Sequence, residues 1–460
     1  METIEKIKEY QNSYEKVDLL VHKAKEESKI KPQRALEILK EAISIGESIG
    51  YKNGLAKAYL NAGIYNRQLS NFDLSFQNYN EAFNIFKDLE DLNGESRVLN
   101  SIGNVHYSLS NFDKALENYE SSLEILSKIN DKEFTALVYS NIGLVYQEMN
   151  NLTSSLASYY ESLNIYRELN LAIPHSLYNN IGIVYQDIGD YPASIDHFKK
   201  ALLLEEEEGN LNFQCSTLGN IGISYIRMGE YMNAVTYLGE ALIIARMMSN
   251  RQAESNIYSH LGTAYGIMKS FPLAIDYHTK AHKINKQLGD KSSVAKTLHH
   301  LGKLYFELHD YVACKKSYLE ALDTALEAND DINESRIYIG LAILYKKFTD
   351  YKSTENYVNK ALVLAAKRNA LKELINIHNI LSDCDKENGR YDSSIKNLEL
   401  SKSYEKNILN LEEERKIRNI ILHKSFQFDD KLNGSNGHSL NKLKKAMSNG
   451  HSLNALRMTI

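Results

Sequence analysis

Polar side chains recur about every 40 residues along this chain. The row consists mostly of amides and ends in two imidazoles: Asn61, Ser101, Asn141, Asn180, Asn220, His260 and His300. Asn100, Asn179 and His299 each directly precede a member of this row, and Asn104 follows Ser101 by three positions. An amide donates and accepts hydrogen bonds at once, so a row of amides can bind both the N–H and C=O groups of an extended peptide. The chemistry that the row offers is polar recognition.

The imidazoles His260 and His300 stand at equivalent places in neighbouring units. Neither cysteine nor carboxylate accompanies them, so we expect no metal site. His299 and His300 are adjacent and cannot both face one ligand squarely from a helix. Sensing of pH is an alternative that the sequence leaves open.

No motif for catalysis accompanies the row. The sequence contains no phosphate loop, nucleophile elbow, HExxH motif or CxxC pair. Packing explains nearly every strongly repeated position, which leaves no residue set with a catalytic geometry. We therefore predict that the protein is not an enzyme and uses no cofactor.

The row belongs to an internal repeat, and such a repeat is typical of a solenoid. The landmark of each unit is the residue that opens its second helix: Pro32, Phe72, Phe112, Leu152, Tyr191, Tyr231, Phe271, Tyr311, Tyr351 and Tyr391. Every step between landmarks is 40 residues except one of 39. Small residues stand three and ten positions after each landmark, and such residues let two helix axes approach to roughly 8–10 Å.

A glycine follows each member of the polar row by two positions: Gly63, Gly103, Gly143, Gly182, Gly222, Gly262 and Gly302. Glycine within a helix costs about 1 kcal/mol relative to alanine, so its recurrence indicates close packing. Capping residues precede most landmarks: Asn71, Asn111, Asn151, Asp190, Ser270, Asp310 and Asp350. Each unit is therefore predicted to be a helical hairpin.

The Gly-x-x-Tyr of the first helix, the aromatic-x-x-small start of the second and its later alanine resemble the tetratricopeptide repeat over residues 14–410. The 40-residue period is similar to the long-repeat subgroup of Pins/LGN-type polarity adaptors and bacterial signalling sensors. The resemblance implies an all-α, right-handed superhelical solenoid of about ten hairpins. It also implies that the first helices line a concave channel, into which the polar row points.

Basic residues join the row on the same helices. They are Lys57, Arg67, Arg97, Lys296, Lys303, Arg336, Lys346 and Lys347, with Glu148, Asp187 and Glu307 among them. In a protein of net charge −5, this favours an acidic or carboxylate-bearing ligand, although exposed lysines are also often only solvated. The net charge disfavours nucleic acid.

The resemblance implies an amide ladder along the backbone of a bound peptide. The predicted peptide groove comprises Asn61, Asn100, Asn104, Asn141, Asn179, Asn180, Asn220, His260, Lys296, His300, Lys303, Arg97 and Arg336. The alternative is that these amides are solvated or bond neighbouring repeats.

Four segments are expected. They are a polar helical lead-in (1–13), the solenoid (14–404), a charged amphipathic helix (405–424) and a flexible basic tail (425–460). The helix either caps the solenoid or mediates self-association or docking. Residues 431–460 carry five Lys or Arg and no acidic residue, so residues 1–430 carry −10. The motif SNGHSLN occurs twice in the tail, which is either disordered or a short docking motif.

The N-terminus lacks the apolar core of a signal peptide, and no segment is apolar enough to span a membrane. Cys215, Cys314 and Cys384 fit small core positions in a reducing compartment, so we expect a cytoplasmic protein. Two functions remain. The first is a scaffold that binds a protein or peptide partner in its groove. The second is a bacterial-type regulator that senses a peptide or protein and transmits through its C-terminal helix to a separate effector.

Overall fold

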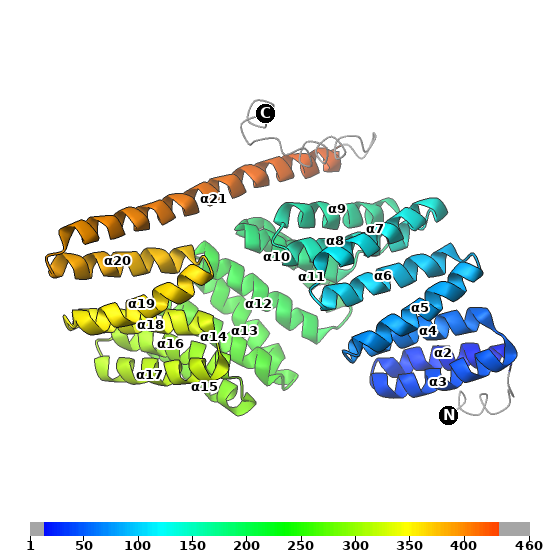
Figure 1. Ribbon diagram of the computed structural model, residues 1–460, viewed down its shortest axis with the longest axis horizontal. Coiled ribbons are helices and arrows are strands. Elements are labelled where there is room, and N and C mark those ends of the chain that lie inside the picture. Colours follow the sequence, from blue (N-terminus) through cyan, green and yellow to red (C-terminus); the bar gives the residue numbers. More distant parts are fainter. Residues whose placement is uncertain (1–12, 432–460) are drawn as a thin grey trace. The chain divides into compact units, whose positions relative to one another are not determined.

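The computed structural model describes residues 13–431, and every regular element among them is a helix (Figure 1). The first helices of the hairpins are α2 (Tyr14–Ser28), α4 (Lys52–Gln68), α6 (Leu92–Ser108), α8 (Lys132–Glu148), α10 (His175–Ile188), α12 (Leu211–Met228), α14 (Arg251–Ile267), α16 (Lys291–Glu307), α18 (Asp331–Lys347) and α20 (Leu371–Glu387). The second helices are α3 (Pro32–Ile49), α5 (Phe72–Asp88), α7 (Phe112–Ile129), α9 (Leu152–Glu168), α11 (Tyr191–Glu207), α13 (Tyr231–Met247), α15 (Phe271–Leu288), α17 (Tyr311–Ala328), α19 (Tyr351–Lys367) and α21 (Tyr391–Lys431). The predicted all-α solenoid is confirmed.

All ten landmark residues are the first residue of a helix, so the register read from the sequence is correct. The predicted caps are right in part. The side chains of Asn151, Asp190, Asp310 and Asp350 accept a backbone hydrogen bond from the first turn. Those of Asn71, Asn111 and Ser270 make no such bond; the Asn71 amide instead donates to Asn66 Oδ1 at 3.5 Å.

The repeated glycines are required by close packing within each hairpin. A methyl group on Gly103 would lie 2.5 Å from the ring of Tyr119, and one on Gly302 would lie 2.6 Å from the ring of Tyr318. Real side-chain carbons do not approach this closely, so any larger residue would displace the ring. Both tyrosines are almost fully buried and extend from the second helix across the first. This contact fixes the distance between the two helices of a hairpin.

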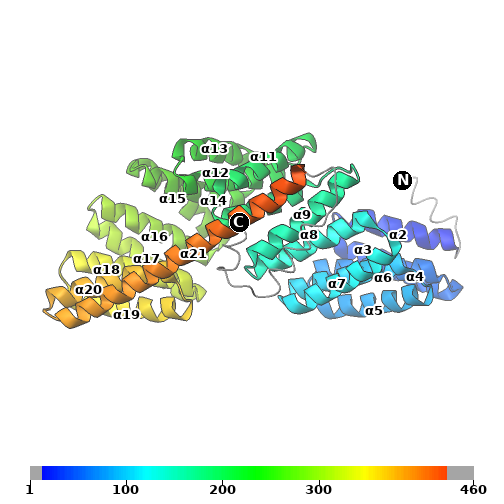
Figure 2. The same ribbon diagram turned by 90° about the horizontal axis from the view of Figure 1, so that it is seen from above.

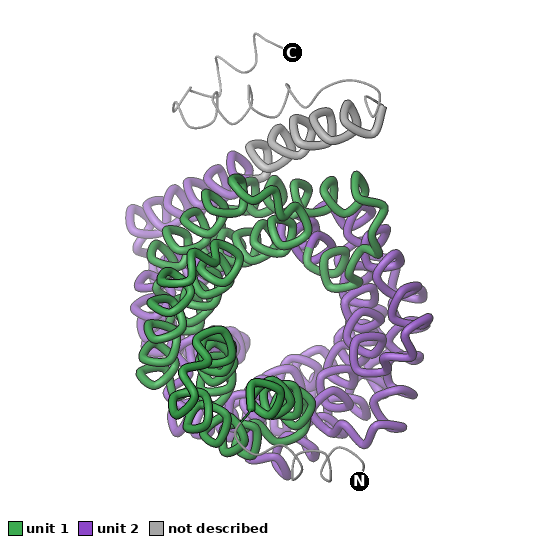
Figure 3. Tube along the Cα trace, turned by 90° about the vertical axis from the view of Figure 1, so that its right-hand side faces the viewer, with its two compact units in different colours: residues 1–180 green, residues 181–460 purple. Residues whose placement is uncertain are grey.

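The described chain forms two compact units, residues 1–180 and 181–460 (Figure 3). The boundary lies within α10, which has 14 residues, whereas α8 and α12 have 17 and 18. This is also the place where the landmarks are separated by 39 residues instead of 40. The chain from Leu171 to Pro174 is irregular, because proline lacks an amide and disfavours a helical conformation in the residue before it.

The last second helix differs from the segments expected from the sequence. The predicted boundary between solenoid and charged helix, at residues 404 and 405, falls inside α21, which runs without a break from Tyr391 to Lys431 (Figures 1 and 2). Residues 425–431, assigned to the tail, are also helical. The lead-in up to residue 12 and the tail from residue 432 lie outside the described residues. No helix among residues 13–431 is long and apolar enough to cross a membrane.

Candidate functional site

The first helices of each unit lie closer to one another than the second helices do. In unit 2, α12 contacts α14, α14 contacts α16, α16 contacts α18, and α18 contacts α20. In unit 1, α2, α4, α6 and α8 form a similar series. No two second helices of the described chain approach each other to a comparable extent. A stack of hairpins curves toward the layer whose helices are closer together, so the first helices form the concave face of each unit.

The amide row of unit 1 is largely bonded within the protein. Asn141 Nδ2 donates to Asn100 Oδ1 at 2.8 Å, which joins two neighbouring repeats, and Asn100 is only 5% exposed. Asn104 Oδ1 accepts from the Tyr119 hydroxyl at 2.7 Å. Asn61 Nδ2 donates to the Lys57 carbonyl of its own helix at 2.8 Å. These amides orient one another and the tyrosine below them.

The end of unit 1 offers different groups. Asn180 is half-buried, and its side chain has no hydrogen-bond partner among the described residues. Asn179 Oδ1 is buried and also lacks a partner. Arg97, by contrast, is held by the protein itself: its Nε donates to Asn93 Oδ1 at 2.6 Å, and its guanidinium lies 4.4 Å from the centre of the Phe134 ring. Within this unit, Asn180 is the predicted residue most available to a ligand.

In unit 2 the row passes from amide to imidazole. Asn220 on α12 is half-buried, and its side chain has no partner among the described residues, although its carbonyl accepts from Gln186 Nε2 at 3.1 Å. His260 on α14 and His300 on α16 follow at the equivalent positions and are also half-buried. The equivalent position is therefore polar in all three repeats, but its side chain is an amide in the first and an imidazole in the next two.

Of the two predicted histidines, His300 is stacked on other rings, and His260 lies near enough to His278 to help lower its pKa. His278 on α15 is 2% exposed, and its ring is parallel to that of His300, with 4.9 Å between the ring centres. His299 meets His300 edge-on at 5.8 Å and contacts the ring of Tyr318 at 5.7 Å. The Nδ1 atoms of His278 and His299 are buried and have no hydrogen-bond partner. We call His260, His278, His299 and His300 the histidine stack.

Two members of the stack, His299 and His300, line a cavity of about 360 Å³ between α16, α18 and α20. We call it the basic cavity. The side chains that carry its charge are Lys296, Lys303, Arg336, Lys372 and Glu373, with His299 and His300 beside them. Glu373 Oε1 lies 3.4 Å from Arg336 Nε, and its other oxygen accepts from Arg368 Nη2 at 2.8 Å. Lys296, Lys303 and Lys372 have no ion-pair partner among the described residues. The cavity is therefore electropositive.

Burial and neighbouring positive charge keep the histidine stack neutral. Burial lowers the pKa of His260 and of His278 to about 4, and Lys296 adds to the effect in both cases. Burial lowers the pKa of His299 to about 3, with Lys303 and Arg336 contributing. The pKa of His300 falls well below its ordinary value because of burial and then of His278. No group of three or more His, Cys, Asp or Glu side chains in residues 13–411 could hold a metal ion.

Comparison with known proteins identifies the repeat. A model of the tetratricopeptide repeat matches residues 94–168 and 213–287, and a second model of the same repeat matches residues 176–207. The chain contains tetratricopeptide repeats. No curated protein sequence matches it. The closer likeness to Pins/LGN-type adaptors stays a prediction.

Three solved structures share the fold of this repeat protein at 16% sequence identity. The apo form of the quorum sensor NprR from B. thuringiensis has a TM-score of 0.59, and the match covers 78% of this chain and 99% of that chain. The apo form of RapI has a TM-score of 0.51, with 60% and 99% covered. A signal transduction ATPase from Pyrococcus horikoshii with a tetratricopeptide repeat sensor has a TM-score of 0.53, with 74% and 54% covered. These likenesses establish the fold.

Sequence reasoning about the repeat protein missed His278 and Lys372. The signal for His278 was present, because the position seven residues after a landmark holds Tyr79, Tyr119, Tyr159 and Tyr318 in other repeats. A histidine at a packing position that is a tyrosine in four other repeats departs from the repeat pattern. Lys372 is the second residue of α20, and it comes near Lys296 and Lys303 only when the repeats stack.

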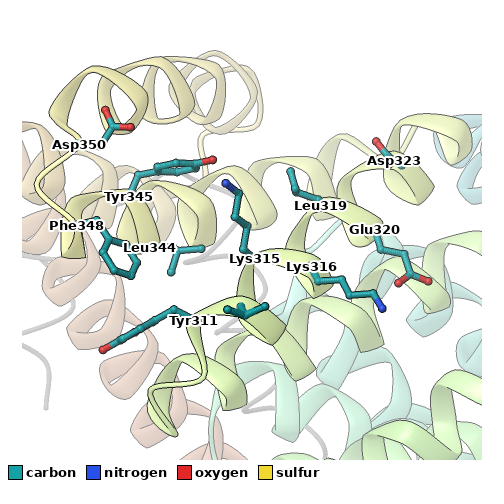
Figure 4. Close-up of a pocket in the computed structure, with 11 residues that line it drawn as sticks. Tyr311, Lys315, Lys316, Leu319, Glu320, Asp323, Leu344, Tyr345, Phe348 and Asp350 are labelled. Atoms are coloured by element: carbon teal, nitrogen blue, oxygen red, sulfur yellow. The ribbon is translucent and has the colours of Figure 1, made fainter.

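A second pocket, of about 840 Å³, lies on the side of the second helices (Figure 4). Tyr311, Lys315 and Leu319 from α17 face Tyr345 from α18 and Phe348, which directly follows α18, across it. Lys315 Nζ lies 5.3 Å from the centre of the Tyr345 ring, so this lysine is already in contact with an aromatic face. The pocket contains none of the predicted site residues.

Proposed function

We propose that this tetratricopeptide repeat protein is a non-enzymatic interaction scaffold that binds a peptide segment of a partner protein along its first helices. The observation that carries the proposal is the set of polar groups without partners on the concave faces. Asn180 and Asn220 have unbonded side-chain amides, and Lys296 and Lys303 lack carboxylates. Buried or half-buried polar groups normally find a hydrogen-bond partner, so such a set supports a missing ligand.

The predicted site residues take different roles in this proposal. Asn180 in unit 1 and Asn220 in unit 2 would each bind the backbone N–H and C=O of an extended segment that lies along the first helices of its own unit. Asn61, His260 and His300 continue the row. Asn61 already donates one hydrogen bond to its own helix, and burial keeps the two imidazoles neutral. Asn100, Asn104 and Asn141 would position the row, and Arg97 would hold the edge of α6 through its contact with Phe134. Asn179 directly precedes Asn180, and its buried Oδ1 has no partner.

An acidic ligand fits the charge of the concave face better than a neutral one. Lys296, Lys303 and Arg336 surround a cavity whose single carboxylate, Glu373, is already bonded to two arginines. Electropositive surfaces of this kind select partners of opposite charge and accelerate their association. A nucleic acid is not the expected partner of a chain with net charge −5. The three cysteines are free and buried, which fits a reducing compartment such as the cytoplasm.

A signalling regulator is the second candidate function. The observation that favours it is α21, because one uninterrupted helix connects the last hairpin to residue 431. A change in that hairpin on ligand binding would be passed along the helix to an effector or to a second copy of the chain. Measuring the mass of the full-length protein by light scattering, with and without residues 405–460, tests self-association through this segment.

The scaffold proposal is tested by selecting ligands from a random library of 12-residue peptides displayed on phage, with the purified full-length chain as bait. Selected peptides are then measured by fluorescence anisotropy against the double variant Asn180→Ala, Asn220→Ala. We expect affinity to fall about tenfold or more, since each lost amide removes about 1 kcal/mol of hydrogen bonding.

The matched control is the double variant Asn356→Ala, Asn359→Ala, which removes two exposed amides from the second helix α19. It should bind the selected peptides as the wild type does. Equal loss in both double variants, or no loss in either, would contradict binding along the first helices.

A further inference from the structure

The basic cavity has more positive charge than its own carboxylates neutralise. Lys296 and Lys303 project from one helix, and Lys372 lies across from them on α20. None of the three has an ion-pair partner among residues 13–411. Arg336 shares Glu373 with Arg368, so that carboxylate has little capacity left for the lysines. Several uncompensated cations around one partly open cavity favour an anion there.

Behind the cavity, the histidine stack contains hydrogen-bonding capacity that the protein does not use. His300 lines the cavity, and His278 lies flat against it from the opposite side. His278 Nδ1 and His299 Nδ1 have no partners, although both atoms are buried. A neutral imidazole has one donor and one acceptor nitrogen, and a protonated imidazole has two donors. The stack can therefore take up a proton if an anion compensates its charge.

His278 occupies this place because Gly262 leaves room for it. A methyl group on Gly262 would lie 2.6 Å from the His278 ring. The same pairing of glycine and ring holds Tyr119 against Gly103 and Tyr318 against Gly302. The scaffold therefore accepts a tyrosine at this position in other repeats, and here it carries a titratable group next to the groove.

We propose that the basic cavity binds acidic side chains of the peptide ligand, and that its occupation draws a proton onto the His278–His300 pair. This rests on the proposed peptide-binding function and specifies its ligand and its regulation. The occupant is a segment rich in Asp or Glu. Protonation adds a positive charge behind the cavity, and the carboxylate in front of it removes the penalty that otherwise keeps the imidazoles neutral.

The charged and titratable groups around the pair determine the direction of the coupling. They are Arg227 on α12, His260 on α14, Lys296, His299 and Lys303 on α16, Tyr318 on α17, Arg336 on α18, and Lys372 and Glu373 on α20. Cations predominate among them, so the free protein disfavours the imidazolium. A bound carboxylate within roughly 4–6 Å reverses part of this repulsion and raises the pKa of the pair.

The sign of the pH effect follows from this change. The bound state holds a proton more tightly than the free state, so affinity rises as pH falls through the raised pKa of the complex. The window lies between the ordinary value of 6.5 and the free-state value of about 4. Above this window neither state is protonated, and affinity is independent of pH. Uptake of one proton changes the affinity by at most tenfold per pH unit.

The experiment measures fluorescence anisotropy of two labelled octapeptides, all-glutamate and all-glutamine, with the purified full-length chain at pH 7.5, 6.5 and 5.5 and constant ionic strength. We expect the glutamate probe to bind more tightly than the glutamine probe at every pH. We also expect its affinity to rise about three- to tenfold between pH 7.5 and 5.5. Equal affinity of the two probes, or a glutamate affinity that does not change with pH, would overturn the proposal.

Two variants localise the effect. His278→Tyr introduces the residue that other repeats carry at this position, so the fold is expected to accept it, and it should reduce the rise in affinity to less than twofold. His309→Asn removes an exposed histidine at a left-handed position that asparagine tolerates, and it should leave the rise unchanged. A full rise in the His278→Tyr variant would assign the proton to another group and contradict the proposal.

A second readout separates this proposal from the proposed function. NMR titration of ¹³C-labelled histidine rings should show one imidazole of unit 2 whose pKa increases when the glutamate probe is added. If library-selected peptides bind through Asn180 and Asn220 while no histidine pKa changes, the scaffold function stands and this inference fails. If neither selected peptides nor the glutamate probe bind, both fail together.

Discussion

The concave faces of the two units use one scaffold to present opposite kinds of surface. In unit 1 most of the amides are bonded within the protein, as in the bond between Asn141 and Asn100 and in that between Asn104 and Tyr119, and the exceptions are Asn179 and Asn180 at its end. In unit 2, His299 on the first helix α16 and His278 on the second helix α15 have unbonded imidazole nitrogens, and α16 also carries lysines without carboxylate partners. The packing positions are the same in both units, so the difference lies in the residues that face the groove. In unit 1 these hydrogen bonds stabilise the fold, whereas in unit 2 the basic cavity attracts negative charge.

Reversing charge in the basic cavity should have the largest effect. The double variant Lys296→Glu, Lys303→Glu places like charges opposite an acidic ligand, which costs several kcal/mol. We expect the affinity for the glutamate octapeptide to fall about 100-fold, which corresponds to about 2.7 kcal/mol. Anisotropy measures it, with Lys352→Glu, Lys396→Glu on second helices as the control of equal charge. A similar loss in the control would mean that net charge, and not the cavity, attracts the ligand.

Acid should destabilise unit 2 through its histidines. The pKa of His278 is lowered to about 4 in the folded protein, so the unfolded chain binds more protons below pH 6.5, and stability falls as pH decreases toward 4. At pH 5 this amounts to about 2 kcal/mol for His278 alone. Urea unfolding at pH 7.5 and 5 should show a smaller acid loss in His278→Tyr than in the wild type. An identical loss of stability in both proteins would mean that His278 does not contribute to the destabilisation by acid.

Packing, unlike groove chemistry, should respond alike in both units. Gly103→Ala in unit 1 and Gly302→Ala in unit 2 each force a carbon against a buried tyrosine ring, and we expect each to destabilise the protein by about 1–2 kcal/mol. Gly239→Ala is the matched control, because no atom outside its own helix lies within 4 Å of the added carbon. It should stabilise the protein by about 0.5–1 kcal/mol. Thermal unfolding followed by circular dichroism measures all three.

The smallest effect separates the two amide roles. Asn141→Ala leaves the nearly buried Asn100 oxygen without its donor, so we expect a loss of about 1–2 kcal/mol of stability. Asn220→Ala removes a side chain without a partner and should change stability by less than about 0.5 kcal/mol while weakening peptide binding. If Asn220→Ala destabilises as much as Asn141→Ala does, the amides of the two units do not differ in role.

The periodic features of this fold could be predicted because each repeats a local cause. Every landmark from Pro32 to Tyr391 begins a helix, and the recurring glycines lie against the rings that require them. Features that depend on one repeat meeting the next could not be predicted in the same way. The bond between Asn141 and Asn100, and the approach of Lys372 to Lys296, exist only after stacking.

Two local exceptions show where the repeat pattern misled. The capping residues Asn71 and Asn111 look like Asn151 in sequence, yet only Asn151 accepts a cap hydrogen bond, because an asparagine amide can turn to other neighbours. The charged stretch after residue 404 looks like a new element in composition, yet nothing in it breaks a helix, and α21 continues through it. A change in composition along the chain shows that the exposed side chains change, but it does not show that the helix ends.

The central claim is that an acidic peptide binds on the first-helix face of unit 2. Photocrosslinking tests it most directly, with a glutamate octapeptide that carries one benzophenone residue and mass spectrometry to locate the labelled residues. The account predicts labels in Lys291–Glu307, Asp331–Lys347 and Leu371–Glu387. Labels concentrated in Tyr311–Ala328, beside the pocket on the second helices, would contradict it.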